Sequence, residues 1–210
     1  QQHQIMKLDE AIYEKRLLVC AEKFNDISII VNNAVNQLNK YGEKVVVIDT
    51  DHTFAEYEPV RFKKDFKLPL TSKMIDFIYD TELEEVDEAT KAVIQDILLE
   101  VQNYANTVDF IPIESFISVV AEQYEETKIP ELALLKNKLI KYNENNIFAQ
   151  TKEEYESLKT LISSNNVLYI DIAGITDDLQ KELINYINDT MESCDEYIYS
   201  FVKISNKNSD

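Results

Sequence analysis

Two apolar runs on either side of one helical pattern, within residues 16–51, constrain the fold more than any other feature of this chain. RLLVCA and KVVVID are short and almost wholly apolar, which is typical of strands buried on both faces of a sheet. Between them, apolar residues recur at helical spacing from Ile27 to Leu38, and Gly42 follows where a helix would end. A strand, a helix and a strand this close together predict a right-handed crossover between parallel strands.

Helical periodicity dominates the middle of the chain, and strand patterns return towards its end. Apolar residues recur at three and four positions over most of residues 71–160, whereas apolar runs in TVDFIPI, NNVLYIDIAG and EYIYSFVKIS predict three more strands. In the last of these runs we expect alternation at Tyr197, Tyr199 and Phe201. Thr176 precedes a helical pattern and is predicted to cap it.

These elements predict an α/β fold with a doubly wound, mainly parallel sheet. We expect a single α/β domain over residues 16–205, with a helical insertion, or lobe, at about residues 71–160. Residues 1–15 are expected to be a polar leading segment and residues 206–210 a mobile tail. Because the sequence begins with Gln rather than Met, we expect it to be a fragment or a processed chain.

The loop after the first strand occupies the place of a phosphate loop but lacks the residues that bind phosphate. Such a loop needs Gly, four residues, Gly, Lys and then Ser or Thr. In the window AEKFNDIS, Ala21 and Asp26 stand at the glycine positions, Ile27 stands at the Lys position, and only Ser28 fits. The whole chain has 2 glycines, where average usage of about 7% would give roughly fifteen. We therefore expect a vestigial site that does not bind ATP appreciably.

The acidic residues that follow the second strand are the best candidates for chemistry. Asp49 and Asp51 stand at its carboxyl end, where open α/β sheets bind ligands, and Asp171 ends another predicted strand. Such carboxylates can hold a hard cation, or they can simply be solvated or cap the next turn. If the site is not catalytic, Asp49→Asn is expected to leave the stability unchanged or slightly higher.

The same segment resembles the first motif of the haloacid-dehalogenase phosphohydrolases, in which Asp, any residue, Asp, any residue and Thr follow an apolar strand. The resemblance implies Asp49 as nucleophile, Asp51 as acid/base and Mg²⁺ as cofactor. Asp171, with Asp177 and Asp178, would stand in for the distal acidic motif of that family. His52 occupies the place of the Gly usual in hydrolytic members, and a whole strand-helix unit precedes the motif.

The order of elements resembles HerA/FtsK-type ATPases. An apolar strand, the phosphate-loop position, a helix ending in KYG and then VVVIDTDHTFAEY carry the resemblance, with Asp49 followed by Glu56 and Tyr57. NVLYIDIAGITDDLQKELINYI is similar to the "IDLSG" segment and the next helix of that family. The last strand falls where a magnesium-binding Asp-Glu pair would be, but Ser205 and Asn206 follow it.

The resemblance implies a RecA-like P-loop NTPase core whose catalytic motifs are degenerate. The leading interpretation is thus a pseudo-ATPase module without a cofactor, which acts through protein-protein contacts in a larger protein or assembly. The alternative is the Mg²⁺-dependent phosphohydrolase, which Mg²⁺-dependent hydrolysis of a generic aryl phosphate would distinguish from the first interpretation. The strand order of the sheet decides whether Asp49 lies on a central or a second strand.

Charge and cysteine usage limit the partners and the setting. Asp and Glu number 39 against 21 Lys and Arg, giving a net charge of −18, so we expect no direct binding of nucleic acid by this chain alone. A protein partner or a homo-oligomer is expected instead, without a membrane. The basic residues Arg61, Lys63 and Lys64 are predicted to pair within the chain. Cys20 and Cys194 are isolated, which favours a reduced, cytoplasmic setting.

Overall fold

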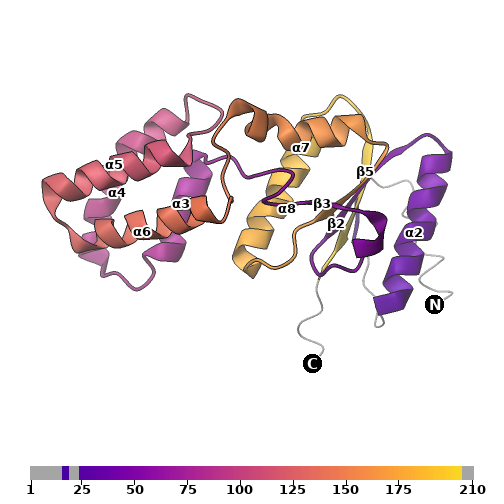
Figure 1. Ribbon diagram of the computed structural model, residues 1–210, viewed down its shortest axis with the longest axis horizontal. Helices are drawn as coiled ribbons and strands as arrows, with labels where there is room; N and C mark the ends of the chain where they lie inside the picture. The colour runs from indigo at the N-terminus through magenta and orange to yellow at the C-terminus, as the bar shows by residue number, and fades with distance from the viewer. Residues whose placement is uncertain (1–15, 19–23, 205–210) are drawn as a thin grey trace. The chain divides into compact units, whose positions relative to one another are not determined.

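The computed structural model describes residues 16–18 and 24–204 of the 210-residue chain, with side chains from residue 27 onward (Figure 1). The chain divides into two compact units, one formed by the residues up to 65 together with those from 157, and the other by residues 66–156. The predicted leading segment and tail, residues 1–15 and 206–210, lie outside the described residues.

The first unit is built on a parallel sheet. Its strands are β1 (Arg16–Leu18), β2 (Lys44–Asp49), β3 (Val60–Arg61), β4 (Val167–Asp171) and β5 (Ile198–Lys203). They lie in the order β1-β5-β2-β4-β3, and every neighbouring pair is parallel. The predicted α/β fold with a parallel sheet is therefore confirmed. Asp49 ends the central strand, and both neighbours of that strand come from the last part of the chain.

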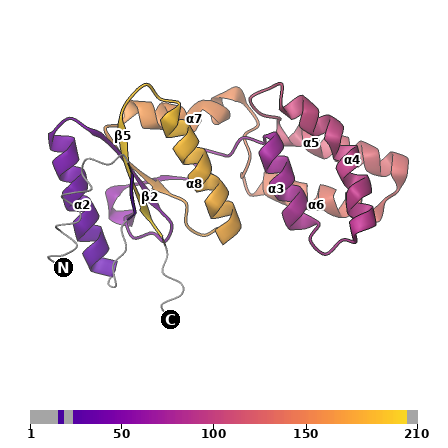
Figure 2. The same cartoon turned by 180° about the vertical axis from the view of Figure 1, so that it is seen from behind.

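Helices cover both faces of this sheet. They are α2 (Phe24–Lys40), α7 (Lys152–Ser164) and α8 (Asp177–Glu192), and both views place α2 on one side of the strands and α8 on the other (Figures 1 and 2). The buried stripe of α2, from Ile27 to Leu38, forms one hydrophobic cluster with Val45 and Val47. Val46 and Ile48 alternate with these and are also 0% exposed, because a strand covered on both faces buries every side chain.

The second unit is helical. It contains α3 (Ser72–Glu82), α4 (Glu88–Ala105), α5 (Ile113–Thr127) and α6 (Pro130–Glu144). The hydroxyl of Thr71 accepts the backbone N–H of Met74 at 3.3 Å and so caps α3, and Asp87 caps α4 in the same way through Thr90 at 2.9 Å. The chain enters and leaves the unit side by side, since Leu68 forms a parallel bridge with Phe148.

Three details of the sequence-based prediction are wrong. TVDFIPI is not a strand: Ile111 and Ile113 are buried, but the segment is a loop that leads into α5. A buried apolar loop and a short strand carry the same pattern, so periodicity alone could not separate them. The two-residue strand β3 was not predicted, because Val60 and Arg61 are too few residues to show a strand period.

The expected alternation in the last strand is the third error. Tyr197 lies before β5 and is 63% exposed. Within β5, Ser200 and Phe201 are both buried. The strand lies between β1 and β2 and is covered on both faces, so its burial does not follow a period of two.

No helix within residues 24–204 has both the length and the apolar character that a membrane crossing needs.

Candidate functional site

The parallel register brings three charged residues together at the carboxyl edge of the sheet. Asp49 at the end of β2 is aligned with Asp171 at the end of β4 and with Lys203 at the end of β5. All three are nearly inaccessible, with exposed fractions of 0%, 3% and 3%. The next residues of the chain, 50–54, fold over this row. We call these three residues, together with Asp51 and His52, the edge cluster.

Asp49 holds the covering loop in place. One carboxylate oxygen accepts the backbone N–H groups of Asp51 at 3.1 Å and Thr53 at 3.2 Å, and the other accepts that of Phe54 at 2.8 Å. Burial raises the pKa of Asp49 above its ordinary value, although the N–H groups of Phe54 and Asp51 lower it. The side chain is therefore turned inward, and both of its oxygens are occupied by the chain itself.

This geometry reverses the sequence-based expectation for Asp49→Asn. An Asn side chain has one acceptor oxygen, so its amide nitrogen would face the N–H of Phe54 or of the 51–53 turn. A buried donor left without an acceptor costs about 1–3 kcal/mol. We therefore expect the substitution to destabilise the protein.

Asp51 pairs with Lys203 across the edge of the sheet. The ammonium Nζ of Lys203 lies 2.6 Å from Oδ2 of Asp51 and also donates to the carbonyl of Ile204 at 2.9 Å. Thr53 donates its hydroxyl to the other carboxylate oxygen at 2.5 Å. Burial alone would raise the pKa of Asp51, but the hydrogen bonds from Lys203 and Thr53 hold it below its ordinary value.

His52 completes the cluster on the opposite flank. Its Nδ1 lies 2.5 Å from Oδ2 of Asp171, whose other oxygen accepts the N–H of Ala173 at 2.8 Å. The His52 side chain is 58% exposed and that of Asp171 is 2% exposed, so a buried carboxylate orients an imidazole that faces solvent. His52 has a φ of 62°, a left-handed conformation that Gly would adopt at lower cost.

Aromatic residues fix the loop that carries these side chains. Phe54 is 0% exposed and belongs to the α2 cluster. The ring of Tyr57 stacks on that of Tyr169, with centroids 4.8 Å apart and an interplanar angle of 12°. The Glu56-Tyr57 pair thus lies in a short 3₁₀ helix, Ala55–Tyr57, in which Tyr57 is packed and Glu56 is exposed.

The vestigial phosphate-loop position lies at the start of α2. Ala21 falls outside the described residues, and for Asp26 only the helical backbone is described. Ile27, at the position of the missing Lys, is 4% exposed and belongs to the core of the sheet. Ser28 is half-buried on the same helix. At the position where a phosphate loop would place the ammonium of a Lys, the first turn of α2 therefore places the buried side chain of Ile27.

Other predicted residues do not join the cluster. Asp177 and Asp178 lie exposed in the first turn of α8, where carboxylates favour the helix dipole. No described residue forms an ion pair with Arg61, Lys63 or Lys64, so the predicted internal pairing is not seen for them, although neighbouring Lys67 pairs with Glu154 at 2.5 Å. Within the described residues, no three His, Cys, Asp or Glu side chains gather so as to hold a metal ion.

Lys203 is the member of the edge cluster that sequence reasoning missed. The resemblance to HerA/FtsK-type ATPases places a magnesium-binding acidic pair just after the last strand, at Ser205 and Asn206, which lie outside the described residues. The available signal was a lysine at the end of an apolar strand. A lysine placed there needs a buried partner, and a carboxylate at the same sheet edge is the natural one.

No family model, no curated protein and no solved structure matches this chain.

Proposed function

We propose that this chain is a degenerate, RecA-like ATPase module that does not hydrolyse nucleotide and acts through protein-protein contacts within a larger protein or assembly. The order of elements along the chain is compatible with the proposed HerA/FtsK kinship: strand, helix and central strand, then the helical unit, then strand, helix and strand. This is the order in which the resembling sequence segments occur. The strand that precedes the phosphate-loop position, β1, lies at one edge of the sheet.

The observation that carries the proposal is the ion pair between Lys203 and Asp51, which neutralises one carboxylate of the edge cluster from within the chain. Ligands of open α/β sheets bind at the carboxyl ends of the strands. Here the ammonium of Lys203 lies against Asp51, at the place where a divalent cation would serve a nucleotide. A cation would have to displace a lysine that is 3% exposed. The chain thus carries its own positive charge at this edge.

The start of α2 supports the same conclusion. Ile27 contributes to the core, and a Lys in its place would place its charge against Val31 and Val45 instead of a phosphate. Asp26 adds a negative charge to the same turn, which opposes a triphosphate.

Calorimetric titration with ATP and Mg²⁺, together with the melting temperature, tests the proposal. We expect no heat of binding at micromolar ATP and no change in melting temperature with Mg²⁺ up to millimolar concentration, because Lys203 already occupies the edge. Micromolar affinity for ATP would refute it. Lys203→Met is the matched variant: if the ammonium excludes the cation, only this variant gains stability when Mg²⁺ is added.

A second candidate is the Mg²⁺-dependent phosphohydrolase, and one observation favours it. Asp49 ends the central strand of the sheet rather than an edge strand, as a nucleophile at a topological switch point would. Against it, both oxygens of Asp49 accept backbone N–H groups and the residue is 0% exposed. Hydrolysis of an aryl phosphate that requires Mg²⁺ and is lost in Asp51→Asn, with the fold intact by circular dichroism, would establish this candidate over the first.

A further inference from the structure

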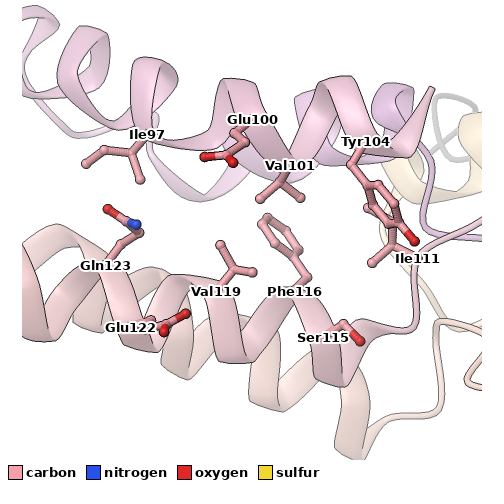
Figure 3. A pocket seen from close by; sticks show the side chains of 10 residues that line it. All are labelled: Ile97, Glu100, Val101, Tyr104, Ile111, Ser115, Phe116, Val119, Glu122 and Gln123. Atoms are coloured by element: carbon pink, nitrogen blue, oxygen red, sulfur yellow. The ribbon is translucent and has the colours of Figure 1, made fainter. Parts of the chain in front are cut away.

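We propose that the groove between α4 and α5 is the docking site for a basic amphipathic helix of a protein partner. This inference rests on the proposed function, since it names the chemistry of the partner through which a non-catalytic module would act. The groove has a volume of about 330 Å³ and lies wholly within the helical unit. Figure 3 shows side chains of the two helices facing one another across it.

The groove has an apolar floor and walls. Val101, Ile111 and Phe116 form the floor and are 8%, 3% and 1% exposed. Ile97 and Val119 are half-buried and form the walls. On each helix the lining residues recur at three and four positions, so the groove runs along both helices (Figure 3). That is the shape that receives the apolar face of a third helix, with anchors at i, i+3 or i+4, and i+7.

The rim of the groove is acidic. Glu100 and Glu122 line it from opposite helices, and both are exposed. Residues 92–127, which contain the lining of the groove, include no Lys, Arg or His. Of the acidic residues in this range only Glu100 and Glu122 line the groove, and Glu125 pairs with Lys128 at 2.6 Å. The seven acidic residues are Asp96, Glu100, Asp109, Glu114, Glu122, Glu125 and Glu126.

The negative charge at the rim favours a cationic partner. A cationic helix would find carboxylates on both sides of its apolar anchors, which favours encounter and orientation. A second copy of this chain, with its net charge of −18, would instead bring like charges together at the rim. Nucleic acid and anionic lipid surfaces are repelled for the same reason. Tyr104, 59% exposed at one end of the groove, supplies a ring face on which an Arg or Lys of the partner can lie.

Fluorescence anisotropy with a set of labelled peptides tests the proposal on the full chain. Each peptide has about 18 residues, or roughly five helical turns, with Leu at the anchor positions and Lys or Arg elsewhere. The set varies the anchor spacing, and each peptide has a counterpart in which Glu replaces the basic residues. We expect at least one cationic peptide to bind, its affinity to fall as salt rises, and the acidic counterparts not to bind.

Substitutions at the rim and walls of the groove test whether the peptide binds there. Glu100→Lys combined with Glu122→Lys should weaken the cationic peptide about tenfold or more, and Ile97→Ser combined with Val119→Ser should weaken it at least as much. The matched control is Glu84→Lys combined with Glu85→Lys, which makes the same charge change at exposed sites outside the groove. The control should stay within about twofold of the parent. Circular dichroism verifies the fold of every variant.

Several outcomes would overturn the proposal. These are no binding by any cationic peptide, equal binding by the acidic counterparts, or equal weakening by the control and the rim variant. Self-association of the chain that is lost in the Ile97 and Val119 variant would assign the groove to a second copy instead. Because none of these measurements involves ATP, Mg²⁺ or phosphate esters, a failure here is distinct from a failure of the proposed non-catalytic role.

Discussion

Replacing Lys203 by Met should destabilise the protein by about 3 kcal/mol, because it leaves Asp51 facing a buried site without its cation. Losing one partner of a fully buried ion pair costs about 3–5 kcal/mol. Asp51 keeps the hydroxyl of Thr53, and its side chain is 14% exposed, so we place the cost at the low end of that range. For a chain of 210 residues, about 3 kcal/mol corresponds to a fall of roughly 6–12 °C in melting temperature.

A double-mutant cycle with Asp51→Asn isolates the pair. Urea unfolding followed by circular dichroism should give a coupling of about 2 kcal/mol, because the double variant removes both charges and leaves neither one buried alone. The effect should also depend on pH. The pKa of Asp51 lies below its ordinary 3.8 in the folded protein, so the stability it contributes is present above that value and is lost as the pH falls through the folded pKa.

The cost of Lys203→Met should accordingly be complete at pH 7 and shrink below about pH 4. A cost under about 1 kcal/mol at pH 7 would refute the reasoning, since it would mean that the pair is solvated and that the edge of the sheet is open to cations. A large cost that does not shrink in acid, with no coupling to Asp51, would instead assign the role of Lys203 to the packing of its methylene chain.

Three further predictions concern single residues. Asp49→Asn should lower the free energy of unfolding by about 1–2 kcal/mol at pH 7; an unchanged or higher value in urea unfolding would show that relief of the buried charge outweighs the lost N–H acceptor. Ile27→Lys should destabilise by about 3 kcal/mol or more and restore no heat of ATP binding, whereas a measurable heat would contradict the assignment of this position to the core. Thr176→Ala should cost about 1 kcal/mol, because its hydroxyl accepts the N–H of Leu179 at 3.3 Å, and hydrogen exchange in the first turn of α8 should speed up; unchanged protection there would mean that the cap is dispensable.

The parts of the fold that local patterns encode could be predicted from the sequence. The apolar stripe from Ile27 to Leu38 indicates a helix, and the apolar run Val45–Ile48 indicates a buried strand. Their order along the chain indicates a crossover between parallel strands. Thr176 caps its helix as its position in the sequence indicated. The loop at 107–112 was not predictable in the same way, because a buried apolar loop has the same short apolar pattern as a buried strand.

The site was predictable only in part, for a related reason. The position of Asp49 at the end of a buried strand indicated which edge of the sheet to inspect. Its surroundings depend on strand order, and the pairing of Asp51 with Lys203 joins residues 152 positions apart. A sequence pattern does not specify which strand lies beside which, so the lysine that neutralises Asp51 emerged only from the structure.

The central place of β2 also determines the order in which the protein can be made. Its two neighbours, β4 and β5, begin at Val167 and Ile198, so the ribosome completes all of α3 to α6 before either strand exists. At about 5–20 residues per second, the interval between synthesis of Asp49 and of Lys203 lasts roughly 8–30 s. The helical unit, with its local contacts, can form early in that interval. KVVVID, apolar and rich in β-branched residues, meanwhile has unpaired edges, and in the nascent chain it is the segment most open to chaperones and to misassociation.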